Sequence, residues 1–262
     1  MSVQRPAFLQ RREVVVLLTL GVLALVWLVM PAILQPQEYH GFADQRTFLG
    51  VPNAFDVLSN LAFIVAGAYG LWQLRHEVRG VTPAARLALI VFFTGLTATG
   101  FGSGYYHLAP DDARLFWDRL PMTVAFAGVF GEVFGERVSR RSGIAILLLM
   151  LVIGPFSAIY WRQTGDLSLY ALVQFGGIAG ILVALAATPR GEDPLPWGWL
   201  IGWYIVAKVA ESADAWVWQA TGELFAGHMV KHLAAAAGGF AIARALRLRR
   251  AEVATSRSRF AT

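Results

Sequence analysis

Five residues with the side chains of a hydrolytic site occur in three apolar parts of this sequence. Ser103 and His107 lie in GFGSGYYH, Asp118 lies in LFWDRLPM, and His228 and His232 lie in FAGHMVKHL. A spacing of four places each pair on one face of a helix, one turn apart. Two imidazoles so spaced can bind one metal ion, and an acid inside an apolar segment is costly unless it is paired or functional. Together the five indicate a catalytic zinc site: three histidines, an open position for water and a nearby carboxylate.

Each of these residues also has a simpler interpretation. A serine within GFGSG is typical of close helix packing, and a lone histidine near a membrane surface is usually an interfacial anchor or a hydrogen-bond partner between helices. The combination, rather than any member, favours catalysis. The two remaining histidines, His40 and His76, fall in predicted loops, and we expect both to be solvated.

The composition is that of a membrane protein. Of the 262 residues, 56% are hydrophobic and 15% are charged, where a soluble domain carries about a quarter charged residues. The mean hydropathy is +0.54. The absence of cysteine excludes disulfides and thiolate sites, so any metal ion must be held by nitrogen and oxygen ligands.

Apolar runs and helix breakers predict an all-α, polytopic helical bundle with eight spans. The first run is too long for the core of a signal peptide, so we interpret it as a retained helix before a seven-helix core. No internal repeat is visible, and the connections are too short for a second domain. The predicted spans are 13–34, 55–75, 84–107, 115–135, 142–161, 168–188, 197–218 and 225–246.

Arginine placement predicts the topology. With both termini in the cytoplasm, sixteen arginines fall on the inner side, including Arg5 and Arg190, and four on the outer side. This clustering between apolar runs explains the net charge of +5 and argues against a nucleic-acid surface. The same topology brings the five candidate residues to one depth near the outer face. It therefore supports the site independently of the spacing. The four outer arginines are Arg46, Arg114, Arg119 and Arg162.

The spacing of these residues resembles the alkaline ceramidase pattern, within the CREST superfamily of membrane hydrolases. The pattern is Ser103-x3-His107, then eleven residues to Asp118, then H-x-x-x-H at the start of the last helix. The run FDVLSNLAFIVAG resembles the opening of the family's first core helix, and Asp214 falls where the family often has an acid. The resemblance covers residues 44–246 as the hydrolase core, between an N-terminal segment, 1–43, and a basic cytoplasmic tail, 247–262.

The resemblance implies a zinc-dependent lipid amidase that cleaves ceramide to a sphingoid base and a fatty acid. His107, His228 and His232 would bind Zn²⁺. Asp118 would accept the proton of the attacking water, and Ser103 would bind that water or donate a hydrogen bond to the oxyanion. The substrate would enter sideways from the bilayer.

Two acids of the seventh span have alternative roles. Glu211 and Asp214 lie three residues apart, and one interpretation makes them hydrogen-bond acceptors for the zinc histidines. The alternative is an intramembrane pair with Lys208, also three residues from Glu211. We weight the two equally.

The sequence also departs from the family pattern. It has the extra N-terminal helix, and Asp118 is followed by Arg119 rather than a second acid, which changes the electrostatics around the base. The acidic calcium-binding segment of the eukaryotic ceramidases is replaced by ADQRTFLGVPNAFD. Asp44, Asn53 and Asp56 are too few of the expected ligands, which argues against calcium regulation.

Rival functions remain open. A serine intramembrane protease would use a serine with a histidine, but Phe101 replaces the first glycine of the rhomboid-type G-x-S-G, and two histidines stay unexplained. A receptor-like CREST protein with a structural zinc would fit the superfamily's other branch. Transport is disfavoured because no repeat is visible. The compact, arginine-flanked architecture favours a bacterial inner membrane, and the sequence predicts no oligomeric state.

Overall fold

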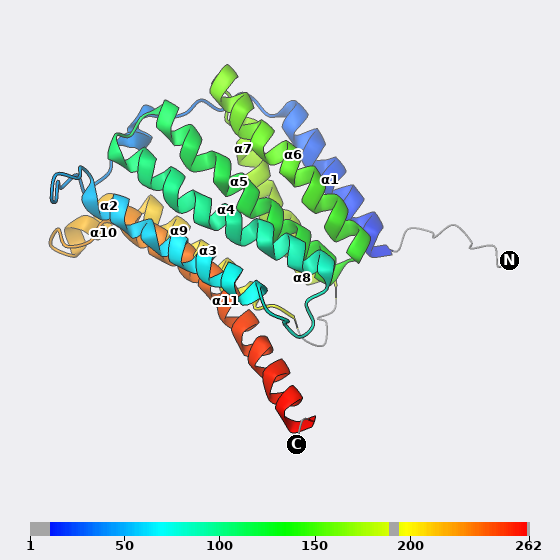
Figure 1. Cartoon of the computed structure of the whole chain (residues 1–262). Coiled ribbons are helices and arrows are strands. Elements are labelled where there is room, and N and C mark those ends of the chain that lie inside the picture. The colour runs from blue at the N-terminus through cyan, green and yellow to red at the C-terminus, as the bar shows by residue number, and fades with distance from the viewer. Residues whose placement is uncertain (1–10, 189–193, 261–262) are drawn as a thin grey trace.

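The protein is a bundle of helices, seen in Figure 1. The computed structural model describes residues 11–188 and 194–260, and no β-strand occurs within these ranges. The elements are α1 (Arg11–Val29), η1 (Gln37–His40), α2 (Ala54–Ser59), α3 (Leu61–Leu74), α4 (Pro83–Leu108), α5 (Asp112–Arg137), α6 (Arg140–Thr164), α7 (Ser168–Ala171), η2 (Leu172–Gly176), α8 (Gly177–Ala187), α9 (Trp197–Ser212), α10 (Asp214–Ala220) and α11 (Gly227–Phe260).

Helix starts follow from short polar residues. Thr82, Asp111 and Ser139 precede α4, α5 and α6, and the side chain of each accepts a hydrogen bond from a backbone N–H in the first helical turn. Such N-caps satisfy donors that the helix itself leaves unpaired. All eight predicted spans correspond to helices, although three are interrupted: α2 and α3 meet at Asn60, η2 is a π-helical turn between α7 and α8, and α9 and α10 meet at Ala213.

Five helical segments have the length and apolar composition to cross a membrane. They are 12–29, 54–74, 83–108, 140–164 and 168–187. The protein is therefore a membrane protein. Helices α5, α9 and α11 carry more polar residues, and the prediction of eight spans stays a prediction for them.

Helices α4 and α5 pack closely enough to bring their site residues together. They run antiparallel, because Gly95 faces Ala125 while Gly128 faces Phe92. A Cβ atom on Gly102 would lie 2.0 Å from the carbonyl oxygen of Trp117, so only glycine permits this approach. Ser103 and Asp118 directly follow these two residues and lie on neighbouring helices at one end of the bundle.

Connections predicted to share a membrane face gather at the same end of the bundle. At the site end, Ile33 N–H donates to Asp166 at 3.0 Å and Ala43 N–H donates to Asp214 at 2.9 Å. At the opposite end, the Ser139 hydroxyl donates to Glu13 at 2.7 Å. The side that each end faces stays a prediction from the arginines, of which Arg5 and Arg190 lie outside the described residues.

The last helix extends past the predicted span. We expected the eighth span to end near residue 246 and a basic tail to follow, but α11 continues as one helix to Phe260. Figure 1 shows its C-terminal half projecting from the bundle.

Candidate metal centre and cavity

Three histidines from two helices that are far apart in the sequence meet in one buried cluster. His107 is in the last turn of α4, and His228 and His232 lie in the first two turns of α11. Their ring centroids are 4.8–4.9 Å apart in all three pairs. One ligand nitrogen from each lies within 4.8 Å of the other two. The structure therefore brings together the three residues that the sequence singled out.

The hydrogen bonds of His232 define its tautomer. The Ser59 hydroxyl donates its one proton to the Asp56 carbonyl oxygen at 2.8 Å and also lies 2.8 Å from His232 Nδ1. Both contacts are satisfied when Nδ1 carries the proton of the ring and donates it to Ser59. Nε2 is left with a lone pair and has no hydrogen-bond partner among the described residues. This is how a protein prepares an imidazole for a metal ion.

His107 is the most isolated of the three. Its side chain is fully buried, and within the described ranges neither ring nitrogen has a hydrogen-bond partner. Buried polar atoms are almost always satisfied in folded proteins, so two orphaned nitrogens in one ring are unusual. Its carbonyl oxygen, in contrast, accepts a hydrogen bond of 2.9 Å from the Asn53 side chain.

His228 is placed by Asp214, which does not touch its ring. Asp214 Oδ1 accepts a hydrogen bond of 2.7 Å from the His228 backbone N–H, and Oδ2 accepts the bond from Ala43. Asp214 thereby joins the start of α11 to the connection before α2. Nε2 of the His228 ring instead lies 3.0 Å from Lys231 Nζ.

Phe42 closes the cluster on one side. Its ring centroid lies 4.6 Å from that of His107 and 4.4 Å from that of His228, and the side chain is buried. Phe42 follows η1 in the long connection that runs from α1 across the ends of the core helices to α2 (Figure 1). The apolar ring limits access of water from this side.

Ser103 and Asp118 form the next layer. Both side chains are buried, both line the same cavity, and the Ser103 hydroxyl lies beside the Asp118 carboxylate as a hydrogen-bond partner. In the part of the chain that the structure describes, no histidine is hydrogen-bonded to Ser103. Instead, His232 contacts Ser59 and His228 contacts Lys231. The ring of His107 has no hydrogen-bond partner among the described residues.

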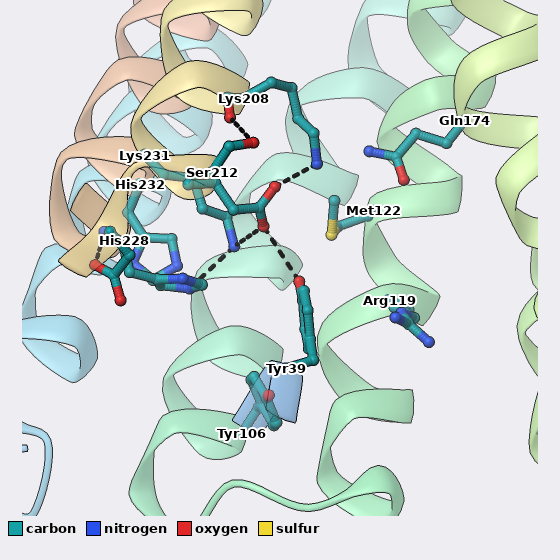
Figure 2. Close-up of polar contacts among 12 residues, drawn as sticks. Tyr39, Tyr106, Arg119, Met122, Gln174, Lys208, Ser212, His228, Lys231 and His232 are labelled. Atoms are coloured by element: carbon teal, nitrogen blue, oxygen red, sulfur yellow. Dashed lines mark hydrogen bonds and ion pairs between the residues drawn. The ribbon is translucent and has the colours of Figure 1, made fainter. Parts of the chain in front are cut away.

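Glu211 is the centre of a charged network, and it pairs with lysines rather than histidines. It forms ion pairs with Lys208 and with Lys231, the latter at 3.2 Å, and accepts a hydrogen bond of 3.2 Å from the Tyr39 hydroxyl. Figure 2 shows Tyr39, Lys208 and Lys231 converging on one carboxylate. Desolvation by the surrounding protein, then the charge of Glu211, raise the pKa of the Tyr39 phenol well above its ordinary value. Tyr39 therefore remains a hydrogen-bond donor.

A cavity of about 340 Å³ opens next to this network. Ser103, Asp118, Arg119 and His232 line its polar end. The rest is formed mainly by apolar and aromatic side chains of α4, α5, α8, α9 and α11: Phe92, Leu96, Phe126, Val129, Phe130, Ile178, Ile181, Leu200, Ile201 and Ala235. Such a cavity fits a hydrocarbon chain attached to a polar group.

The structure corrects the expectation for His40 and agrees with that for His76. His40 is not solvated: Nδ1 lies 2.8 Å from the Tyr106 hydroxyl and Nε2 lies 3.1 Å from Asp112. The connection after α1 folds back onto the ends of α4 and α5, which the sequence pattern did not predict. His76 is exposed.

The sequence analysis missed four residues of the site: Ser59, Lys231, Tyr39 and Phe42. Two had a signal, because Ser59 belongs to the SNL motif and Lys231 is a charge inside an apolar helix, between two histidines. For Tyr39 and Phe42 nothing in the local sequence indicates a role.

The residues considered for calcium have other contacts. Asp44 accepts two hydrogen bonds from Arg46, at 2.6 and 2.9 Å, and Asn53 is bonded to His107. The Asp56 carboxylate is buried with no partner in the described ranges.

Comparison with known families identifies the chain. The ceramidase family model matches residues 51–259, about four fifths of the sequence. The chain belongs to the ceramidase family. Membership implies a lipid amide hydrolase. No curated protein matches the sequence significantly.

The histidine cluster of this ceramidase-family protein fits a metal ion. Three imidazoles, two of them with unpartnered buried nitrogens, are a donor set that suits divalent transition metals. The orphaned nitrogens of His107 and His232 would gain the partner that the protein does not supply.

Proposed function

We propose that the protein is a zinc-dependent intramembrane amidase that hydrolyses ceramide-like lipids to a sphingoid base and a fatty acid. The observation that carries the proposal is the buried cluster of His107, His228 and His232 beside Ser103 and Asp118 at the polar end of an apolar cavity. Family membership supports the reaction class.

The three histidines would hold the zinc ion. Bound there, zinc lowers the pKa of water toward about 7 and polarises a carbonyl. Ser59 holds the ring of His232 at Nδ1, which would leave Nε2 available to the ion, and Asp214 fixes the backbone from which His228 projects.

Asp118 and Ser103 would carry the proton and the developing charge. The Asp118 carboxylate accepts the proton of the attacking water and returns it to the nitrogen of the leaving amine. The Ser103 hydroxyl orients that water or donates a hydrogen bond to the amide oxygen as it becomes an oxyanion. Because both side chains are buried on tightly packed helices, neither must reorganise during the reaction.

The apolar cavity would hold the acyl chain. Its lining residues on α5, Phe126, Val129 and Phe130, follow Asp118 by two to three helical turns toward the interior of the bundle. A chain lying along them leaves its amide at the polar end. The absence of a hydrogen bond between Ser103 and any described histidine favours attack by water over a serine nucleophile, which a protease would need.

The deciding experiment combines metal analysis with mass spectrometry of lipids. The purified wild-type protein is expected to contain about one zinc ion per chain and to release sphingoid base from ceramide, and His228→Ala is expected to lose both. His76→Ala removes an exposed histidine and is the matched control. Wild-type protein without stoichiometric zinc would end the zinc proposal. Zinc without any release of sphingoid base would end the substrate assignment and favour a receptor-like protein.

We also propose the eight-span topology with both termini in the cytoplasm of a bacterial inner membrane and the site near the outer face. The segregation of the connections to two ends supports alternating spans. Reporter fusions at the C-terminus and in the connection 75–82 are expected to report the cytoplasm. A fusion at 221–226 is expected to report the outer side, and any other pattern contradicts the topology.

A further inference from the structure

Arg119 is a buried cation that forms no ion pair with any carboxylate of the described residues. It follows Asp118 on α5. Among the described residues it makes one hydrogen bond, of 2.6 Å, to the side-chain oxygen of Gln35, and its buried Nη1 atom has no partner there. Buried charges in proteins are normally paired with an opposite charge, and the guanidinium of Arg119 lacks such a pair among the described residues.

Aromatic rings surround the guanidinium without neutralising it. Its Cζ atom lies 4.3 Å from the ring centroid of Trp161, 5.1 Å from that of Tyr170 and 5.8 Å from that of Tyr39. Cation–π contacts stabilise the charge, but they supply neither an opposite charge nor an acceptor for the remaining N–H groups. The rings hold the guanidinium in one place and leave its positive field directed at the cavity.

The charged groups around the cavity leave a positive excess at its polar end. Three cations line the cavity, Arg119, Lys208 and Lys231, against two acids, Asp118 and Glu211. The single carboxylate of Glu211 forms ion pairs with both lysines. Figure 2 places Arg119 across the view from His228 and His232, so it lies apart from the lysine network.

We propose that Arg119 binds an anionic group, a carboxylate or phosphate, on the amine part of the lipid amide substrate. This inference rests on the proposed amidase function and narrows its substrate class from ceramide-like amides in general to anionic ones. Guanidinium groups bind both anions through paired, charge-assisted hydrogen bonds, and the unpartnered Nη1 is available for one of them.

The position of Arg119 selects the amine part rather than the acyl chain. It lies one residue from the proposed base, at the polar end, whereas the apolar lining on α5 begins at Met122 and continues through Phe130 into the bundle. An acyl chain along that lining points away from Arg119. The group that remains near Arg119 is the one attached to the amide nitrogen.

The test uses two matched pairs of lipid amides with the purified full-length protein. N-oleoylglycine is compared with N-oleoylethanolamine, and ceramide 1-phosphate with ceramide of the same chains. The wild type is expected to hydrolyse the anionic member of at least one pair with a kcat/KM at least about tenfold higher, the minimum for one charge-assisted hydrogen bond. The pair that shows the preference identifies the anion as carboxylate or phosphate. Equal or lower kcat/KM for the anionic member of both pairs overturns the inference, and this comparison needs no variant.

Variants separate Arg119 from other sources of preference. Arg119→Gln is expected to bring the ratio of kcat/KM for the anionic member to that for the neutral member close to one, and Arg119→Lys is expected to retain part of the ratio. Arg114→Gln is the matched control: it removes a cation from the same end of α5 but outside the cavity, and should keep the full ratio. A ratio that survives Arg119→Gln assigns the preference elsewhere and contradicts the proposal.

A further outcome would identify a different anion. If Arg119 instead binds the carboxylate of the released fatty acid, oleate inhibits the wild type more than Arg119→Gln and neither pair shows a preference, which refutes a substrate anion. Failure of the wild type to hydrolyse any of the four amides removes the proposed function and this inference with it. Hydrolysis without anionic preference removes the inference alone.

Discussion

The two ends of the bundle both bury charged and polar side chains, but they satisfy them differently. At the end opposite the site, Glu136 accepts hydrogen bonds from the Leu195 N–H, at 3.0 Å, and the Trp197 indole, at 3.1 Å, and it pairs with Arg137. At the site end, His107, His232 and Arg119 have nitrogens with no partner in the described residues.

The count of unpartnered atoms follows the same division. Nine buried side-chain nitrogen and oxygen atoms lack a hydrogen bond in the described ranges, and seven of them belong to residues at the site end. A fold that satisfies most of its buried polar groups at one end could do so at the other. The difference therefore distinguishes polar groups that hold the fold together from groups that await a ligand.

The largest expected effect comes from filling an orphaned position with an apolar side chain. His107→Leu should reduce amide hydrolysis to background and abolish metal binding. In the metal-free protein it should raise the free energy of unfolding, by about 1–3 kcal/mol, because a buried polar ring without partners is removed. Thermal unfolding in detergent after chelation measures this. A lower midpoint for the variant would show that the His107 ring stabilises the fold.

Asp118→Asn separates the proton acceptor from the metal ligands. We expect kcat to fall by about 10²–10⁴ while the metal content stays at that of the wild type. Ser103→Ala should reduce kcat by about 10²–10³ if the hydroxyl stabilises the oxyanion. Steady-state kinetics with metal analysis of the same samples measures both. Loss of metal in Asp118→Asn would indicate that Asp118 is itself a metal ligand.

Ser59→Ala should weaken metal binding without removing a ligand. The variant loses the hydrogen bond that fixes the Nδ1-protonated form of His232, and the expected loss of affinity is about 10–100-fold. Competition with a chelator measures the affinity, and added zinc should restore activity. A variant that binds metal as tightly as wild type would show that another contact orients the ring.

The smallest effect on activity is expected at the opposite end. Glu136→Gln weakens three contacts and should lower the free energy of unfolding by about 1–3 kcal/mol. The kcat/KM for ceramide should remain within about twofold of the wild type, a margin well below the cost of one catalytic hydrogen bond. The two variants are expected to have opposite effects. Glu136→Gln should lose stability and keep activity, whereas His107→Leu should lose activity and gain stability in the metal-free protein. A large loss of kcat/KM in Glu136→Gln would contradict the division between the two ends.

The sequence predicted most of the features that depend on the spacing of residues along a helix and on their depth in the membrane. Helix positions follow from apolar runs between breakers, and the convergence of His107, His228 and His232 follows from arginine topology together with the spacing of four. Both signals are local along the chain and do not require knowledge of how the helices pack.

The contacts around the cluster could not be predicted in the same way. From the sequence, Glu211 could equally be a hydrogen-bond acceptor for a histidine or an ion-pair partner of Lys208. The structure pairs it with Lys208 and also with Lys231, which we had not considered. Phe42 was missed, and His40 was expected to be solvated, because the positions of both depend on how an irregular connection crosses the bundle. Such a path is set by tertiary contacts, here Ile33 with Asp166 and Ala43 with Asp214.

The connection after α1 has a consequence for how this protein can be modified. Residues matched by the family begin at 51, yet Gln35, Tyr39 and Phe42, all before that point, contact Arg119, Glu211 and the histidine rings. The connection between α1 and α2 is thus part of the site, although most of it precedes the residues that the family model matches. A chimera or truncation joined at residue 51 would retain every proposed catalytic side chain and still discard one wall of the chamber in which they operate.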